Sequence, residues 1–159
     1  MEPIHMRKII SGVLLACMAC AGAMAAEAEK HYGSNVSISV DGKTAGHQAV
    51  AEFGKKVSIT TTREGQPIRM DYVVTRIEVG DKDNPTDKPL SRITGKVFVP
   101  EKGDAWQVAS EFSVMAQTGQ PFHFEKRGDR FHTSIDMTVT PMTDEQVREK
   151  QADTFKKAA

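Results

Sequence analysis

Two histidines form the pattern in this sequence that comes nearest to a chemical site. His123 and His132 flank Arg127-Gly128 in the stretch FHFEKRGDRFHTSIDMTVT. A two-residue turn at Arg127-Gly128 places the two imidazoles opposite each other, with Cβ atoms about 5 Å apart. Imidazole is a good ligand for zinc or copper, and Glu125 or Asp136 on the same face supplies a third ligand. The sequence therefore predicts a metal site at His123 and His132, with two solvated histidines as the simpler alternative.

The same turn predicts a hairpin with complementary cross-strand pairs. Lys126 would face Asp129, Glu125 would face Arg130, and an aromatic pair would follow. Each such pair contributes roughly 0.2–1 kcal/mol. Every second residue after the turn is then placed inward, and Pro141 ends the strand because proline cannot donate to a ladder. The predicted inward set is Phe131, Thr133, Ile135, Met137 and Val139.

Other motifs for metal binding or catalysis are incomplete. Asp81, Asp83 and Asp87 are spaced like calcium ligands, but the loop lacks the central glycine, and Arg92 stands where a bidentate glutamate belongs. We therefore interpret this segment as a solvated loop. The sequence has no Gly-x-Ser-x-Gly, Ser-x-x-Lys or His-Glu-x-x-His motif and no phosphate loop. A non-enzymatic protein is favoured, with a small hydrolase with a dispersed site as an alternative.

Residues 1–25 have the composition of a signal peptide. A basic start precedes an apolar stretch, and Ala23-Met24-Ala25 provides the small residues of a cleavage site. Cleavage near Ala25 predicts a periplasmic or secreted protein. The alternative is a lipoprotein anchored at Cys17, since Leu14-Leu15-Ala16-Cys17 is similar to a lipobox. The 21 basic and 21 acidic residues balance, which argues against nucleic acid as a partner.

Residues 26–142 predict one all-β domain. About eight short alternating segments are separated by turn signals such as Asp41-Gly42, which is typical of an antiparallel β-sandwich, with a small barrel as the alternative. The phase of the pattern changes near Thr75-Arg76, which suggests a bulge. Residues 143–159 predict a C-terminal helix or tail, because Thr143 and Gln146 form a capping box.

Two segments of the chain look alike. Residues 49–60 and 114–125 each contain a strand, a glycine and a second alternating strand, and a long strand follows each of them. The pattern suggests two repeated β-meanders, one for each sheet of a sandwich. Chance similarity between short hairpins is the alternative, because alternating strands carry little information.

These observations favour an exported binding or accessory protein of the bacterial envelope. Its partner would be another envelope protein, and exposed edge strands would offer a place for strand addition. No cofactor is expected under this hypothesis. The alternatives are a periplasmic metal-binding protein that uses the paired histidines, with zinc or copper as its metal, and the small hydrolase.

Overall fold

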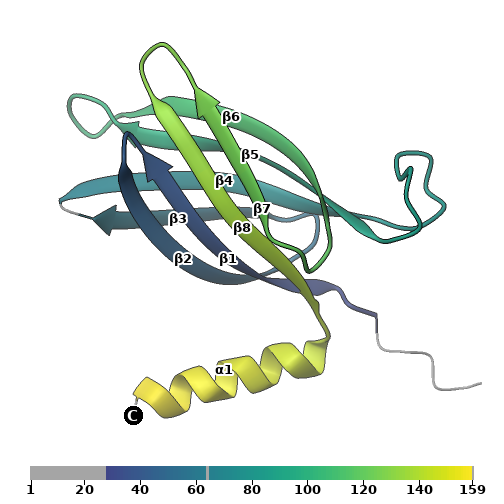
Figure 1. The fold of residues 1–159 in the computed structure, drawn as a ribbon. Helices are drawn as coiled ribbons and strands as arrows, with labels where there is room; N and C mark the ends of the chain where they lie inside the picture. The colour runs from purple at the N-terminus through teal and green to yellow at the C-terminus, as the bar shows by residue number, and fades with distance from the viewer. Residues whose placement is uncertain (1–27, 64, 159) are drawn as a thin grey trace, which may run out of the picture.

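A computed structural model describes residues 28–63 and 65–158, and the predicted signal peptide and Cys17 lie outside them. The described chain forms two antiparallel four-stranded sheets and one C-terminal helix (Figure 1). Sheet A has the order β2-β1-β8-β7, and sheet B has the order β3-β4-β5-β6. The strands are β1 (His31–Val40), β2 (Lys43–Glu52), β3 (Lys56–Arg63), β4 (Gln66–Ile77), β5 (Leu90–Pro100), β6 (Trp106–Gln117), β7 (Phe122–Arg127) and β8 (His132–Met142).

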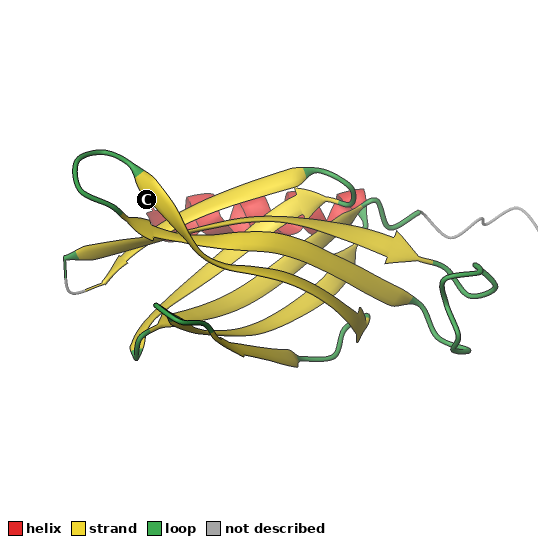
Figure 2. Cartoon of the chain, turned by 90° about the horizontal axis from the view of Figure 1, so that it is seen from above, coloured by secondary structure: helices red, strands yellow, loops and turns green. Residues whose placement is uncertain are grey.

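The strand order is that of an up-and-down barrel opened along two seams. Within each sheet, neighbouring strands are consecutive in the chain or are β8 and β1, whereas β2 does not pair with β3 and β6 does not pair with β7. The turns consequently gather at two opposite ends of the molecule (Figures 1 and 2). The predicted β-sandwich is therefore confirmed, and the structure is not the closed barrel that we held as the alternative.

Alternate side chains from both sheets fill the space between them. Five even-numbered residues of β1 are buried, and the same alternation in β8 buries the predicted inward set from Thr133 to Val139. Tyr32 and Tyr72 are the largest fully buried side chains. The Tyr72 hydroxyl shares a hydrogen bond of 2.9 Å with the Ser34 hydroxyl, and burial raises the pKa of both tyrosines. Other core residues include Val36, Ile38, Ile59, Met70, Ile93, Val97 and Phe112.

The β7–β8 register differs from the prediction. His123 pairs with Asp136, Phe124 pairs with Ile135, and a four-residue loop follows Arg127. The predicted pairs of His123 with His132, Lys126 with Asp129 and Glu125 with Arg130 are therefore wrong. The observed register slides each strand by an even number of positions, so the inward set is unchanged. Local pairs worth a fraction of a kcal/mol did not decide the register, because β8 also aligns along the whole of β1.

Two irregularities also differ from the prediction. The pairing of β4 with β5 runs without interruption past Thr75-Arg76, where the sequence suggested a bulge. The shift lies instead between β5 and β6, where Val97 pairs with Ser110 and Phe98 pairs with Val108, so that Ala109 is the extra residue. Ile77, where the phase of the pattern changes, is the last residue of β4. It pairs with Leu90, and the loop of residues 78–89 follows it.

The chain passes from one sheet to the other at two equivalent glycines. Gly54 lies between β2 and β3, Gly119 lies between β6 and β7, and both have positive φ, at 80° and 81°. The Gly54 N–H donates to the Val74 carbonyl over 2.8 Å, and the Gly119 N–H donates to the Val139 carbonyl over 2.8 Å. The similar segments found in the sequence thus share a local geometry. Each segment spans both sheets, so the prediction of one repeat per sheet is wrong, while a duplication stays a prediction.

The helix α1 (Asp144–Ala158) crosses the outer side of sheet A without burying any of its residues. Its N-terminus has the predicted capping box: the Gln146 side chain accepts from the Thr143 N–H at 2.9 Å, and the Thr143 hydroxyl accepts from the Gln146 N–H at 3.3 Å. His31 Nδ1 lies 3.0 Å from Asp144 and ties the helix to β1. Figure 1 shows the helix standing apart from the strands.

Gly95 is the position where the sandwich tolerates a side chain least. A Cβ there would lie 2.5 Å from the Asp71 carbonyl oxygen and 2.7 Å from Cζ of Phe112. We expect Gly95→Ala to lower the free energy of unfolding by about 1–3 kcal/mol, as overpacking does. The matched control is Gly46→Ala, also in a strand, where the nearest atom is 3.8 Å away. Urea denaturation of both variants checks this, and equal stability of the two would contradict it.

Candidate functional site

The predicted histidines lie on the outer face of sheet A, each beside a carboxylate. His123 Nδ1 is 2.7 Å from Asp136 Oδ1, and His132 Nε2 is 2.5 Å from Glu125 Oε1. His123 Nε2 lies 3.9 Å from the second oxygen of Glu125. The four side chains therefore form a row in which histidine and carboxylate alternate. The two imidazoles do not face each other as predicted, because Glu125 stands between them.

This row shifts the pKa values of two of its members in opposite directions. The hydrogen bond that the His123 imidazolium donates to Asp136, reinforced by the charges of Asp136 and Glu125, raises the pKa of His123. The hydrogen bond from His132 is the main reason why the pKa of Glu125 lies below its usual value. His123 therefore stabilises the fold most when it is charged, below its unfolded-state pKa of about 6.5, and this contribution is lost as the pH rises through its higher folded-state pKa. The contribution of Glu125 is lost at low pH.

The metal-site prediction gains no geometric support. Among the described residues, no group of three or more His, Cys, Asp or Glu side chains is arranged to hold a metal ion. The carboxylates that were expected as third ligands instead accept hydrogen bonds from the imidazoles or pair with them as ions. Metal binding by His123 and His132 stays a prediction that the geometry does not favour.

A shallow groove crosses the outer face of sheet A beside His123. It has a volume of about 770 Å³ and runs across all four strands. Its floor is low because Ser37 pairs with Gly46 on one side and with Asp136 on the other, so small side chains fill the middle. We call it the face A groove, and its outward residues are Asn35, Ser37, Gly46, Gln48, Pro121, His123, Asp136 and Thr138.

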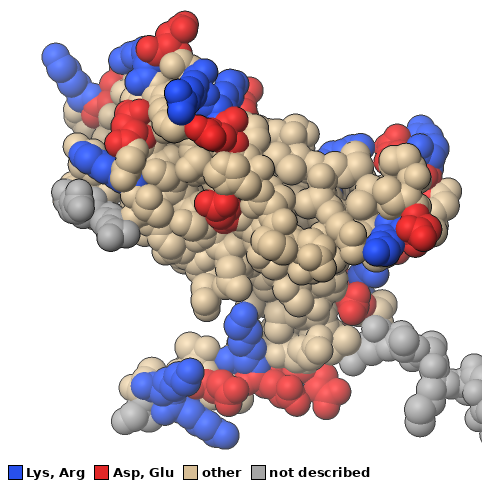
Figure 3. Space-filling view, in the orientation of Figure 1, with Lys and Arg blue, Asp and Glu red and all other residues tan. Residues whose placement is uncertain are grey.

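The face A groove carries little charge, and most of its surface is apolar, with polar groups interspersed. Asp136 is the single acidic residue among those that line it, and the others offer hydroxyl or amide groups or have no polar side-chain atom, apart from the imidazoles of His47 and His123. Figure 3 shows this side of the molecule as mostly uncharged, with the Lys, Arg, Asp and Glu side chains gathered at its ends and on the helix. Such a surface can pack against apolar groups, can form some neutral hydrogen bonds and attracts no strongly charged ligand.

The outer face of sheet B is different because it carries paired charges. The Arg69 guanidinium donates twice to Asp71, over 2.9 and 2.7 Å, and Lys56 lies 3.2 Å from the same carboxylate. These contacts hold the pKa of the buried Asp71 carboxyl down at about 2, with the bond from Arg69 as the largest cause. Lys96 pairs with Glu111 at 2.7 Å. The charges satisfy one another, although this face also carries a groove, of about 700 Å³, between Lys56, Lys96 and Glu111.

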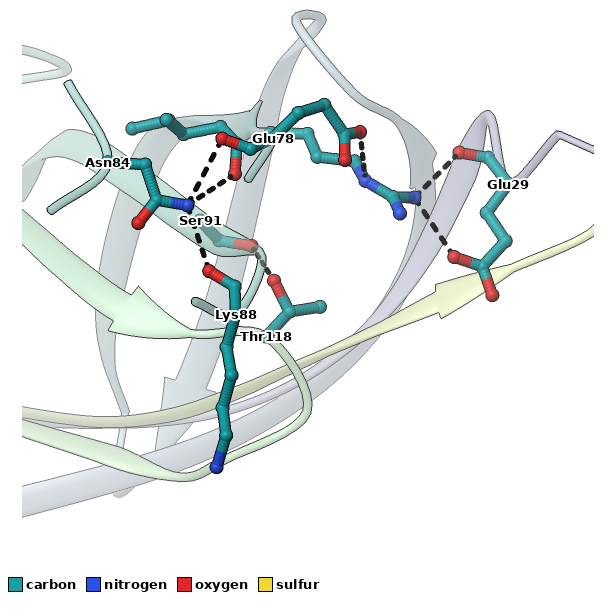
Figure 4. Close-up of polar contacts among 8 residues, drawn as sticks. Glu29, Glu78, Asn84, Lys88, Ser91 and Thr118 are labelled. Atoms are coloured by element: carbon teal, nitrogen blue, oxygen red, sulfur yellow. Dashed lines mark hydrogen bonds and ion pairs between the residues drawn. The ribbon is translucent and has the colours of Figure 1, made fainter. Parts of the chain in front are cut away.

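The loop that was compared with a calcium site is organised by an asparagine. The Asn84 side chain is buried and donates to the carbonyl oxygens of Glu78 and Lys88 over 3.1 and 2.8 Å (Figure 4). Its oxygen accepts from the N–H and the hydroxyl of Thr86. Asp83 contributes an ion pair of 3.7 Å with Arg92, and its N–H donates to Asp81 over 3.3 Å. The predicted loop is confirmed, and the central role of Asn84 in it was not predicted.

The hydrolase alternative requires a nucleophile next to a histidine. In the row of sheet A that contains His123, the order across the strands is Ser37, Asp136, His123, so the carboxylate separates the hydroxyl from the imidazole. In a catalytic triad the histidine stands between the other two groups, because it must take the hydroxyl proton. This row therefore has the wrong order for nucleophilic catalysis.

Comparison of the chain with protein-family models, with curated proteins and with solved structures finds no match. In the described part of the chain, no helix has the length and hydrophobicity that crossing a bilayer requires. By its architecture the protein is an antiparallel β-sandwich with a C-terminal helix.

Sequence reasoning identified His123 and Asp136 but missed the groove beside them. The groove depends on Ser37 and Gly46, which are at least 86 and 77 positions from those two residues and become their neighbours only through the pairing of β1 with β8 and β2. A usable signal was present in the sequence. The alternate positions that hold Asn35, Ser37, Gly46 and Gln48 carry only small or amide side chains.

The pKa of His123 depends on Asp136 and provides a test of this geometry. We expect Asp136→Asn to lower the pKa of His123 toward about 6.5, because the main cause of its elevation is removed. An NMR titration of the His123 ring protons in both proteins measures the change. Asp83→Asn, on a distant loop, is the control and should leave the titration unchanged. A His123 midpoint that is the same with and without Asp136 would contradict the observed pairing.

Proposed function

We propose that this chain is a non-catalytic binding domain of the bacterial envelope that holds a protein partner on the face A groove. The carrying observation is the groove itself, a hollow of about 770 Å³ across the sheet whose surface is mostly apolar and almost uncharged. An exposed sheet face usually carries lysine and glutamate, as the outer face of sheet B does. A face of serine, threonine, asparagine and glutamine avoids the cost of burying charges when a partner covers it.

The envelope location rests on the signal-peptide pattern of residues 1–25. The groove suits neutral hydrogen-bonding groups, such as the backbone or amide side chains of another protein. The phenylalanine that lines it, Phe122, packs against the core, and Trp106 lies in β6 of the other sheet, so the groove lacks an exposed tryptophan for stacking on sugar rings. These features favour a protein partner over a carbohydrate.

The partner is placed on the face and not on a strand edge. The edge strands of the two sheets lie beside each other in pairs, β2 with β3 and β6 with β7. Strand addition needs an edge with unpaired backbone groups and open space alongside it. The seams leave less room for this than the sequence suggested, whereas the groove is open.

Site-specific photo-crosslinking in the producing cell tests the proposal. A photo-reactive residue replaces Ser37 in the groove, and in a second protein it replaces Ser58 on the exposed outer side of β3. We expect a discrete crosslinked protein species from position 37 and none from position 58. The Ser37→Arg variant should compete poorly for the same partner, because a long charged side chain fills the floor. Equal crosslinking at both positions, or none at position 37, would overturn the proposed binding face.

A further inference from the structure

A second concave site lies between the sheets, at the end of the molecule that holds the Asp41-Gly42 turn. This cavity has a volume of about 440 Å³, within the range of about 300–1,000 Å³ that is typical of small-molecule sites. We call it the mouth, and its lining includes Val40, Lys43, Ile68, Val99, Gln107 and Phe131. It is separate from the face A groove, which lies on the outside of sheet A.

The inner wall of the mouth is apolar. Val40 and Ile68 belong to the core, and Val99 and Phe131 pack against that core while remaining partly exposed. Phe131 reaches this position because the β7–β8 loop is longer than a two-residue turn. Partly exposed apolar side chains around a cavity favour an apolar ligand group, since its burial removes both surfaces from water.

The rim of the mouth carries a lysine with a weak partner. Lys43 Nζ of sheet A donates to the Gln66 side-chain oxygen of sheet B over 2.6 Å. No carboxylate lies within ion-pair distance of Lys43 among the described residues. The Gln66 amide is a neutral acceptor, whereas a carboxylate would add the attraction of an opposite charge to its bond with the Lys43 ammonium, so an anion is the stronger partner.

The other charged groups of the mouth are compatible with an anion. The Arg130 guanidinium lies 5.7 Å from the centre of the Phe131 ring and adds positive charge at the loop. Asp41 also lines the mouth, but one of its carboxylate oxygens accepts the His132 N–H over 2.8 Å. Among the described residues that line the mouth, the charged ones are Lys43 and Asp41, and Asp41 is already engaged, while Arg130 lies outside the lining beside Phe131.

We propose that the mouth binds a small amphipathic carboxylate, such as a medium-chain fatty acid. The tail lies between Ile68, Val99 and Phe131, and the carboxylate accepts from Lys43 in place of Gln66. The ligand thereby bridges the two sheets at the end where Lys43 and Gln66 now join them. This site does not depend on the function proposed for the face A groove.

Octanoate is the probe, titrated into the ¹⁵N-labelled mature chain by NMR. We expect saturable shifts at Lys43, Val99 and Phe131, with binding about tenfold weaker in Lys43→Gln, because a charge-assisted bond is lost. Lys96→Gln, an exposed lysine on sheet B, is the matched control and should bind like the wild type. Octanol, which has the same tail and no charge, should bind about as weakly as octanoate binds to Lys43→Gln.

A second variant keeps the test independent of Lys43. Gln107→Trp fills the mouth from its rim and should abolish the octanoate shifts, while the core amide signals remain at their wild-type positions. Ser37→Arg, in the groove, should leave octanoate binding unchanged. The inference is overturned by an absence of saturable shifts, by equal affinity of octanoate for Lys43→Gln and wild type, or by shifts confined to the face A groove.

Discussion

The structure depends on one constraint: the chain must change sheets twice while keeping every second side chain pointed inward. Gly54 and Gly119 make these two changes with positive φ, a conformation that glycine reaches at little steric cost. Each glycine also donates its N–H to a long strand of the sheet that the chain is entering, Gly54 to β4 and Gly119 to β8. The alternation therefore continues from one sheet to the next, and a barrel-like strand order becomes a sandwich with a filled interior.

This arrangement separates the molecule into surfaces with different chemistry. The interior uses the apolar residues together with a buried Tyr72–Ser34 hydrogen bond. The outer face of sheet B uses charges that neutralise one another around Asp71. The outer face of sheet A carries the histidine–carboxylate row toward β7 and mostly uncharged side chains in the face A groove. A neutral partner can therefore cover the groove at a low desolvation cost. The proposed binding roles follow from these differences in charge and shape.

The histidine row illustrates how neighbouring carboxylates change the role of an imidazole. His123 and His132 are each held by an acid, and the shared Glu125 links them. An imidazole whose pKa is raised in this way holds its proton more tightly, which makes it a poorer metal ligand near neutral pH, because metals bind the neutral ring. The same contacts hold the side chains of His123 and Asp136 together at the edge of the face A groove.

The sequence by itself determined the all-β class, the strand alternation, the Asp41-Gly42 turn and the Thr143–Gln146 cap. These features are local, and each depends on the period of side-chain burial or on a few adjacent residues. It also determined which face each residue of β8 presents, since the parity of a strand survives an even shift of register. Only the tertiary structure decided the register of β7 against β8, the position of the β6 bulge, the face A groove and the mouth. These features require residues far apart in the chain to meet, and the free energies of single cross-strand pairs are too small to specify such meetings without the packing of both sheets.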